Sequence, residues 1–298
     1  MNNPVAQTPT NICPYCAREN RAGARFCAVC GTALSVALVP AMANADRDAL
    51  KMAKLRLEHP NLAAKIAEYV GKPIEKAIGM LPAGAKDLIA DSSRGALATG
   101  LKFAVGTMGD PNPKASQDRL HKILVAGTGV VGGAAGLASM LVELPVSTCI
   151  MLRSIADIAR SEGHDITAPD VQLACLEVFA LGGKAASDDA SEEGYWAIRF
   201  ALATAVSEAA TYLANRGAVV EGVPQLVRFV SAIAARFSVI VTEEVAAKAI
   251  PVVGAVSGGL INLAFLDHFQ EMARGHFVVK RLEAQYGTDL VQAEYGKL

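Results

Sequence analysis

The chain has 298 residues and a formal net charge of −1 at pH 7, so no global electrostatic field draws it to nucleic acid or to an anionic bilayer. Hydrophobic residues make up 52% of the sequence but aromatic residues only 5%, so small and aliphatic side chains must build the core, which suits closely packed helices. The opening residues contain no basic stretch followed by an apolar one. We therefore expect no secretory signal and a cytoplasmic protein.

Four of the six cysteines form two C-x2-C pairs separated by ten residues. The pairs are Cys13 with Cys16 and Cys27 with Cys30. Zinc prefers four thiolates in a tetrahedron, and each pair presents two sulfurs to one ion. The pattern predicts a zinc ribbon over residues 1–34 with a structural Zn2+, because four thiolates leave no position open for water or substrate. The stretch ICPYCARENRAGARFCAVCGTAL also resembles the short zinc ribbons at the N-termini of bacterial proteins.

Two features of this ribbon bear on its stability and its partner. Gly31 permits the left-handed backbone that lets amides point at the sulfurs, whereas Ala17 stands where such ribbons carry glycine and is expected to loosen one knuckle. So small a segment cannot bury enough core to fold alone, so the metal is expected to hold it together. Three arginines beside a single glutamate are weak evidence for nucleic acid, and we expect a protein partner instead.

Residues 35–43 are short, apolar and interrupted by Pro40, which indicates a linker. Residues 44–298 predict one all-α domain, because helix start and stop signals follow one another with almost nothing typical of a strand. An acidic loop at Ser187–Glu193 is expected to be a solvated connection. The helices expected, in chain order, are Asp46–Glu58, Pro60–Tyr69, Ile74–Leu81, Ala83–Val105, one capped by Ser116, one from Leu144 to Gly163 that is kinked or begins near Pro145, Pro169–Gly183, Tyr195–Arg216, Pro224–Ala247 and Leu266–Tyr286.

Two glycine-rich segments carry no charge, Ile123–Val142 and Ala249–Leu266. The first is 20 residues long, enough to span a bilayer, and contains GxGxxG at Gly127–Gly132. The residues before that motif favour a helix start and no strand–helix alternation follows, which argues against a nucleotide-binding sheet. Glycines at this spacing let helices pack closely. We expect apolar helical hairpins that contact or insert into the cytoplasmic bilayer face, with a soluble bundle core as the alternative.

The C-terminal third carries four short blocks that resemble the C-terminal signature of the bacterial EcsC family. They are PVVGA from Pro251, DHF from Asp267, ARGHF from Ala273 and RLE from Arg281. The segment ELPVSTCIMLRSIADIA also resembles that family. The resemblance implies a helical fold and a membrane-linked setting, and it implies no particular reaction.

One polar cluster within these blocks is the candidate for chemistry. His268 and His276 lie two turns apart on the expected helix, roughly 12 Å by helical rise, which is too far to bind one metal together. Each would need a partner from another helix. The candidate residues of a ligand or ion site are Glu143, Asp157, Asp267, His268, Arg274 and His276. The alternative is a charged face that pairs Asp267, Glu271 and Arg274, with the histidines capping or packing.

The sequence contains no HExxH, GxSxG or GK[ST] motif, so it indicates no familiar enzyme class. We therefore expect a non-enzymatic, membrane-associated protein whose ribbon recruits a protein partner, and a homo-oligomer stays open. The alternative is a soluble enzyme or small-ligand binder that uses Asp267, His268, Arg274 and His276.

Overall fold

The structure is a computed structural model that describes residues 11–13, 15–20, 24, 26–32, 42–58, 62, 65–67, 74–107, 137–183, 194–217, 219–248 and 255–298. It divides into two compact units, Met1–Arg47 and Asp48–Leu298, and each is described by itself. The boundary falls in the first turn of helix α1.

The N-terminal unit contains a two-stranded antiparallel sheet of β1 (Asn11–Ile12) and β2 (Glu19–Asn20). Its core consists of the buried Cys13 and Cys27, with Cys16 and Ala24 packed against them. Such a core buries too little apolar surface to offset the entropy of ordering the chain, which agrees with a fold held by metal.

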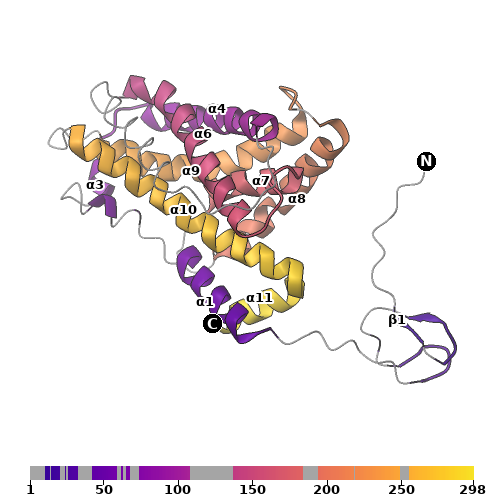
Figure 1. Ribbon diagram of the computed structural model, residues 1–298. Coiled ribbons are helices and arrows are strands. Elements are labelled where there is room, and N and C mark those ends of the chain that lie inside the picture. The colour runs from indigo at the N-terminus through magenta and orange to yellow at the C-terminus, as the bar shows by residue number, and fades with distance from the viewer. Residues whose placement is uncertain are drawn as a thin grey trace. The chain divides into compact units, whose positions relative to one another are not determined.

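The C-terminal unit is helical, as predicted (Figure 1). Its elements are α1 (Asn44–Glu58), α3 (Ile74–Gly79), α4 (Ala85–Thr107), α6 (Leu137–Ser161), α7 (Pro169–Glu177), the 3-10 turn η1 (Val178–Ala180), α8 (Tyr195–Arg216), α9 (Pro224–Lys248), α10 (Ala255–Tyr286) and α11 (Thr288–Lys297). Helix α9 packs against α3, α4, α8 and α10, and α6 packs against α4 and α10. Helices α9 and α10 therefore form the centre of the bundle.

The aromatic part of the core lies where α9, α10 and η1 meet. Phe179, Phe237 and Phe269 are fully buried, with ring centroids 5.0 to 5.8 Å apart. Phe265 lies 5.1 Å from Phe269 in an edge-to-face arrangement. Fully burying each such ring contributes about 1.5–3 kcal/mol, so this cluster holds η1 against both central helices.

Two helix ends follow from single residues that the sequence analysis identified. Gly217 has φ +65° and donates its amide to the Leu213 carbonyl at 2.7 Å, which ends α8 as predicted. Pro145 lies inside α6, so this helix begins before the proline and continues through it. The Ser147 hydroxyl donates to the Glu143 carbonyl at 2.9 Å in the turn around that proline.

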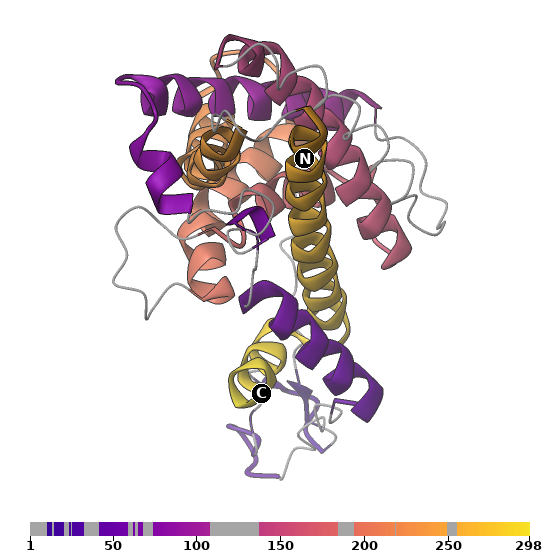
Figure 2. The ribbon, with the colours of Figure 1, turned by 90° about the vertical axis from the view of Figure 1, so that its left-hand side faces the viewer.

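Helices α1 and α11 both pack at the C-terminal half of α10, as Figures 1 and 2 show. Arg56 of α1 pairs with Glu271 of α10 at 2.8 Å, and Lys54 donates to the Tyr295 carbonyl of α11 at 3.0 Å. Gly275 permits the close approach of α1, because a Cβ there would lie 2.6 Å from Leu57 Cγ.

Several expectations differ from the observed elements or fall outside them. Helix α10 begins at Ala255, so part of the second uncharged segment is helical, and α11 was not predicted at all. Of the expected Pro60–Tyr69 helix, only Leu62 and residues 65–67 are described, and they are helical. Residues 35–41 of the linker, the Ser116 cap, the GxGxxG motif, the acidic loop and Pro251 lie outside the described residues.

Candidate functional site

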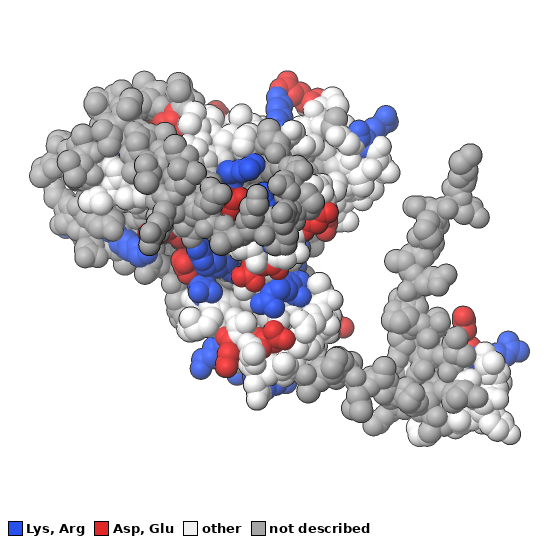
Figure 3. Space-filling view, in the orientation of Figure 1, with Lys and Arg blue, Asp and Glu red and all other residues white. Residues whose placement is uncertain are grey.

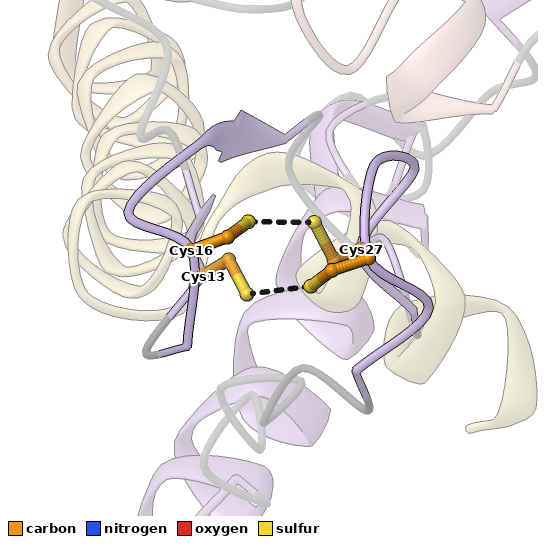
Figure 4. A group of neighbouring side chains, drawn as sticks. Cys13, Cys16 and Cys27 are labelled. Atoms are coloured by element: carbon orange, nitrogen blue, oxygen red, sulfur yellow. Dashed lines mark hydrogen bonds between the residues drawn. The ribbon is translucent and has the colours of Figure 1, made fainter.

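The four predicted zinc ligands converge in the N-terminal unit, and their sulfurs all lie within 4.8 Å of one another. The two shortest distances cross between the pairs: Cys13 Sγ to Cys30 Sγ is 3.5 Å and Cys16 Sγ to Cys27 Sγ is 3.6 Å. Figure 4 shows Cys13 and Cys16 facing Cys27 across the site. Four sulfurs at about 2.3 Å from one zinc would be about 3.8 Å apart, so the donor set fits this ion.

The two knuckles that position these sulfurs repeat the same hydrogen bonds. Ala17 donates to the Cys13 carbonyl at 2.9 Å, and Gly31 donates to the Cys27 carbonyl at 3.0 Å. Gly31 has φ +70° and Ala17 has φ +55°, so the alanine adopts the left-handed backbone that glycine adopts without strain. The sequence prediction for this knuckle therefore has a physical basis in the backbone angle.

The surroundings of Cys27 and Cys16 shift the pKa values of these two thiols in opposite directions. The backbone amides of Cys30 and Val29 lower the pKa of Cys27 to about 6. The Arg18 amide also favours the Cys16 thiolate, but burial and the neighbouring thiols outweigh it and raise the pKa of Cys16 to about 12. A divalent cation among the sulfurs would favour the thiolate at every position, because it removes the opposition between neighbouring charges.

Glu143, one of the predicted candidates, belongs to a largely buried ionic cluster. Lys248 Nζ lies 2.8 Å from Glu143 Oε1 and 2.9 Å from Glu244 Oε1, and Asn262 donates to the same Glu143 oxygen at 3.2 Å. Burial alone would lower the pKa of Lys248, but the two glutamates outweigh it and raise that pKa. This Glu143–Lys248 cluster ties α6, α9 and α10 together.

Asp157 lies further along α6 than Glu143 and has a different environment. Its Oδ1 lies 3.3 Å from Arg160 Nη1, and both side chains are about nine-tenths buried. Nearby on the α6–α10 interface, Gln270 donates to Ser154 at 2.7 Å. Arg274 donates to the Gln270 carbonyl at 3.4 Å. Of these three contacts, the Gln270–Ser154 hydrogen bond links the two packed helices, and the others lie within α6 and within α10.

Asp267 and Glu271 sit on the more exposed side of α10. Asp267 is partly buried and Glu271 is exposed. The Glu271 carboxylate pairs with Arg56 of α1. On this side of α10, Glu271 therefore forms an ion pair with another helix of the domain, α1.

His268 is buried against the turn that follows η1. A Cβ on Gly182, which has φ +75°, would lie 2.5 Å from the imidazole, so glycine leaves the room that the ring occupies. Burial lowers the pKa of His268 to about 4, despite an opposing hydrogen bond with the Leu181 backbone. The ring is therefore neutral at pH 7 and packs as a polar core residue.

His276 lies in a second buried polar cluster, eight residues further along α10. Its Nδ1 is 3.0 Å from the Tyr195 hydroxyl and its Nε2 is 3.7 Å from Glu177 Oε2. Burial holds the pKa of His276 well below its ordinary value and raises the pKa of Glu177. A neutral imidazole that accepts from Tyr195 carries its proton on Nε2, which faces Glu177.

An ion pair lies beside Tyr195 in this Tyr195–His276 cluster. Arg199 pairs with Glu283 at 2.8 Å, and its guanidinium lies 5.5 Å from the centre of the Tyr195 ring. Tyr295 of α11 stacks on Tyr195, with ring centroids 5.9 Å apart. The cluster thus joins α7, α8, α10 and α11.

The sequence analysis identified one residue of each helical cluster and missed the partners. Glu177 stands alone in an apolar run, and Glu244 with Lys248 forms an i,i+4 pair just before an uncharged segment. An isolated charge in an apolar helix is the signal that would have found Glu177. From their spacing, His268 and His276 were expected to have separate partners. The structure places His268 against the turn after η1 and His276 beside Tyr195 and Glu177.

These features define a class of protein: a zinc ribbon followed by a helical bundle with buried polar clusters. A zinc-ribbon domain matches residues 12–34. The EcsC protein family matches residues 48–282, most of the chain, and the protein belongs to that family. No curated protein and no solved structure matches the chain.

Proposed function

We propose that this EcsC-family protein is a non-enzymatic, membrane-associated protein. Its helical domain contacts the cytoplasmic face of the bilayer, and its zinc ribbon docks a protein partner. The observation that carries the proposal is that both uncharged glycine-rich segments lead into the bundle at the same end.

This convergence follows from contacts of described residues. The first uncharged segment leads into α6 and ends just before Glu143, and the second begins just after Lys248 and contains Asn262, on α10. Hydrogen bonds and an ion pair of 2.8 to 3.2 Å join these three side chains. One ionic cluster thus lies at the end of the first uncharged segment and includes a residue of the second. We call this the glycine-rich end.

The described surface near the glycine-rich end exposes aliphatic side chains. Val146, one turn beyond Glu143, is 46% exposed, and Leu260, two residues before Asn262, is 39% exposed. Exposed aliphatic groups at the base of uncharged segments suit contact with the acyl region of a bilayer.

Helix α9 requires separate consideration, because it is the one helix among the described residues that is long and apolar enough to cross a membrane. Its buried residues include Phe229, Ile233, Phe237 and Ile240, and it packs against four other helices. The core helix of a soluble bundle has the same length and composition. We therefore assign α9 to the core and the membrane contact to the glycine-rich end.

The charge distribution favours an apolar over an electrostatic mode of attachment. Basic and acidic side chains are interspersed on the face of the helical domain that Figure 3 shows. A surface that adsorbs electrostatically to anionic lipid instead gathers lysine and arginine on one face. Binding is thus expected to persist in high salt.

Vesicle co-sedimentation tests the proposal with purified full-length protein and a variant that lacks the residues before Asn44. Both proteins should sediment with vesicles of neutral and of anionic lipid, at low and at high salt. If neither protein sediments, the helical domain does not contact the membrane. If the full-length protein alone sediments, the ribbon makes the membrane contact.

The second candidate function is a soluble enzyme or small-ligand binder. The observation that favours it is the line of Tyr195, His276 and Glu177, whose polar atoms lie 3.0 and 3.7 Å apart. Separate His268→Ala and His276→Ala variants test it through the cellular phenotype of a deletion strain. Loss of complementation by a variant with unchanged thermal unfolding would favour a site over packing.

A further inference from the structure

Among the ribbon residues whose side chains the structure describes, three apolar side chains point outward instead of building the core. Tyr15 is 83% exposed, Phe26 66% and Val29 67%. The buried apolar cluster of the ribbon consists of Cys13 and Cys27, with Ala24 packed against them. Metal ligation, and not apolar burial, is what a segment of this size relies on to fold. These three side chains are therefore not needed for the fold of the ribbon.

The same three residues lie on or beside the two hydrogen-bonded knuckles of the ribbon. Tyr15 and Val29 occupy equivalent positions, each directly before the second cysteine of its pair, and Phe26 directly precedes Cys27. Hydrogen bonds of 2.8 to 3.0 Å hold the knuckle backbone, and a metal on the four sulfurs would restrain it further. Apolar and aromatic groups that are ordered before binding lose little entropy on binding, which is the property of interface hot spots.

The charge of the ribbon indicates what kind of surface it meets. Residues 12–34 contain three arginines and one glutamate, a net charge of +2, whereas the rest of the chain has 25 basic and 28 acidic residues and a net charge of −3. Three cations are few for a nucleic-acid interface, where six to ten phosphate contacts are common. A basic module with exposed apolar side chains is complementary to an acidic protein surface.

We propose that Tyr15, Phe26 and Val29 form the docking face of the ribbon, and that its occupant is a protein with a small apolar pocket edged by aspartate and glutamate. This inference rests on the proposed docking function and names its residues and the chemistry of the partner. Tyrosine and phenylalanine fill the pocket, and the exposed Arg18 meets its acidic rim.

The test replaces Phe26 with photoreactive p-benzoylphenylalanine in the full-length protein, in the cells that make it. The control carries the same group at Met80, which is as exposed but lies in the helical unit. Cross-linking alone does not support the proposal. A protein that is cross-linked from position 26 but not from position 80 is therefore purified, and its affinity for the full-length protein is measured. Tyr15→Ser and Phe26→Ser should each weaken binding about 30-fold or more, and Leu55→Ser, at an exposed position of α1, should not.

Each variant should still bind one zinc per chain, and binding should weaken as salt is raised. The proposal is overturned if the variants bind like wild type, if position 26 captures no protein beyond the control, or if it cross-links RNA. Loss of vesicle binding in Phe26→Ser would also overturn it, because the face would then contact lipid. Vesicle binding by the variant lacking the residues before Asn44 tests the membrane proposal independently, so the two can fail separately.

Discussion

Replacing Gly275 with alanine tests the packing of α1 on α10. A Cβ at this position would lie 2.6 Å from Leu57 Cγ and 3.1 Å from the Ala53 carbonyl, and the Leu57 atom is not the flexible end of its side chain. Overpacking of this kind costs about 1–3 kcal/mol. The better helix propensity of alanine offsets up to about 1 kcal/mol of it. We expect Gly275→Ala to lower the free energy of unfolding by about 1–2 kcal/mol.

Urea unfolding followed by circular dichroism measures this change, with Gly95→Ala as the matched control. Gly95 is a helical glycine of α4 with open space where its Cβ would be, so its replacement should stabilise by up to about 1 kcal/mol. In a Leu57→Ala background the cost of Gly275→Ala should largely disappear. If Gly275→Ala stabilises the protein as the control does, the close approach of α1 and α10 is wrong.

Three further predictions concern the ribbon and a buried histidine. Ala17→Gly should stabilise the zinc-bound ribbon by about 1 kcal/mol, because φ +55° is strained for alanine; slower zinc loss to a competing chelator would show it, and unchanged loss would contradict it. Removing zinc with a strong chelator should release one ion per chain and make the ribbon sensitive to protease, while the helical circular dichroism signal stays unchanged. Loss of that signal would show that the two units do not fold separately. The pKa of His268 is about 4 when folded and 6.5 when unfolded, so below pH 6.5 the unfolded chain takes up a proton that the folded one does not, and stability falls. Between pH 7 and 5 this loss is about 2 kcal/mol, and His268→Asn should reduce it; an unchanged pH dependence would mean that the ring is not buried and neutral.

The sequence predicted what depends on local chemistry. The spacing of Cys13, Cys16, Cys27 and Cys30 specified the metal site, because zinc geometry constrains short segments directly. Most helix boundaries lay within a few residues of proline or glycine signals such as Gly217. Helix α11 was missed because its buried residues are only Val291 and Tyr295, one turn apart, which is too little for a periodic pattern.

The partners within the polar clusters depend on topology, which the sequence does not contain. His276 meets Tyr195 across 81 positions of the chain and Glu143 meets Lys248 across 105. Periodicity indicates which face of a helix is buried, but not which helix covers it. Candidate residues could therefore be named one by one, while their surroundings required the fold.

Vesicle affinity of charge-insertion variants tests most directly the claim that the glycine-rich end contacts the membrane. Leu260→Asp and Val146→Asp each add a charge to an exposed side chain at that end. Val227→Asp makes the same change at an exposed position of α9, about 30 Å along its axis from Lys248. The account predicts that Leu260→Asp and Val146→Asp each weaken binding to neutral-lipid vesicles at least tenfold, while Val227→Asp binds like wild type. Equal binding by all three variants, or a loss confined to Val227→Asp, would contradict it.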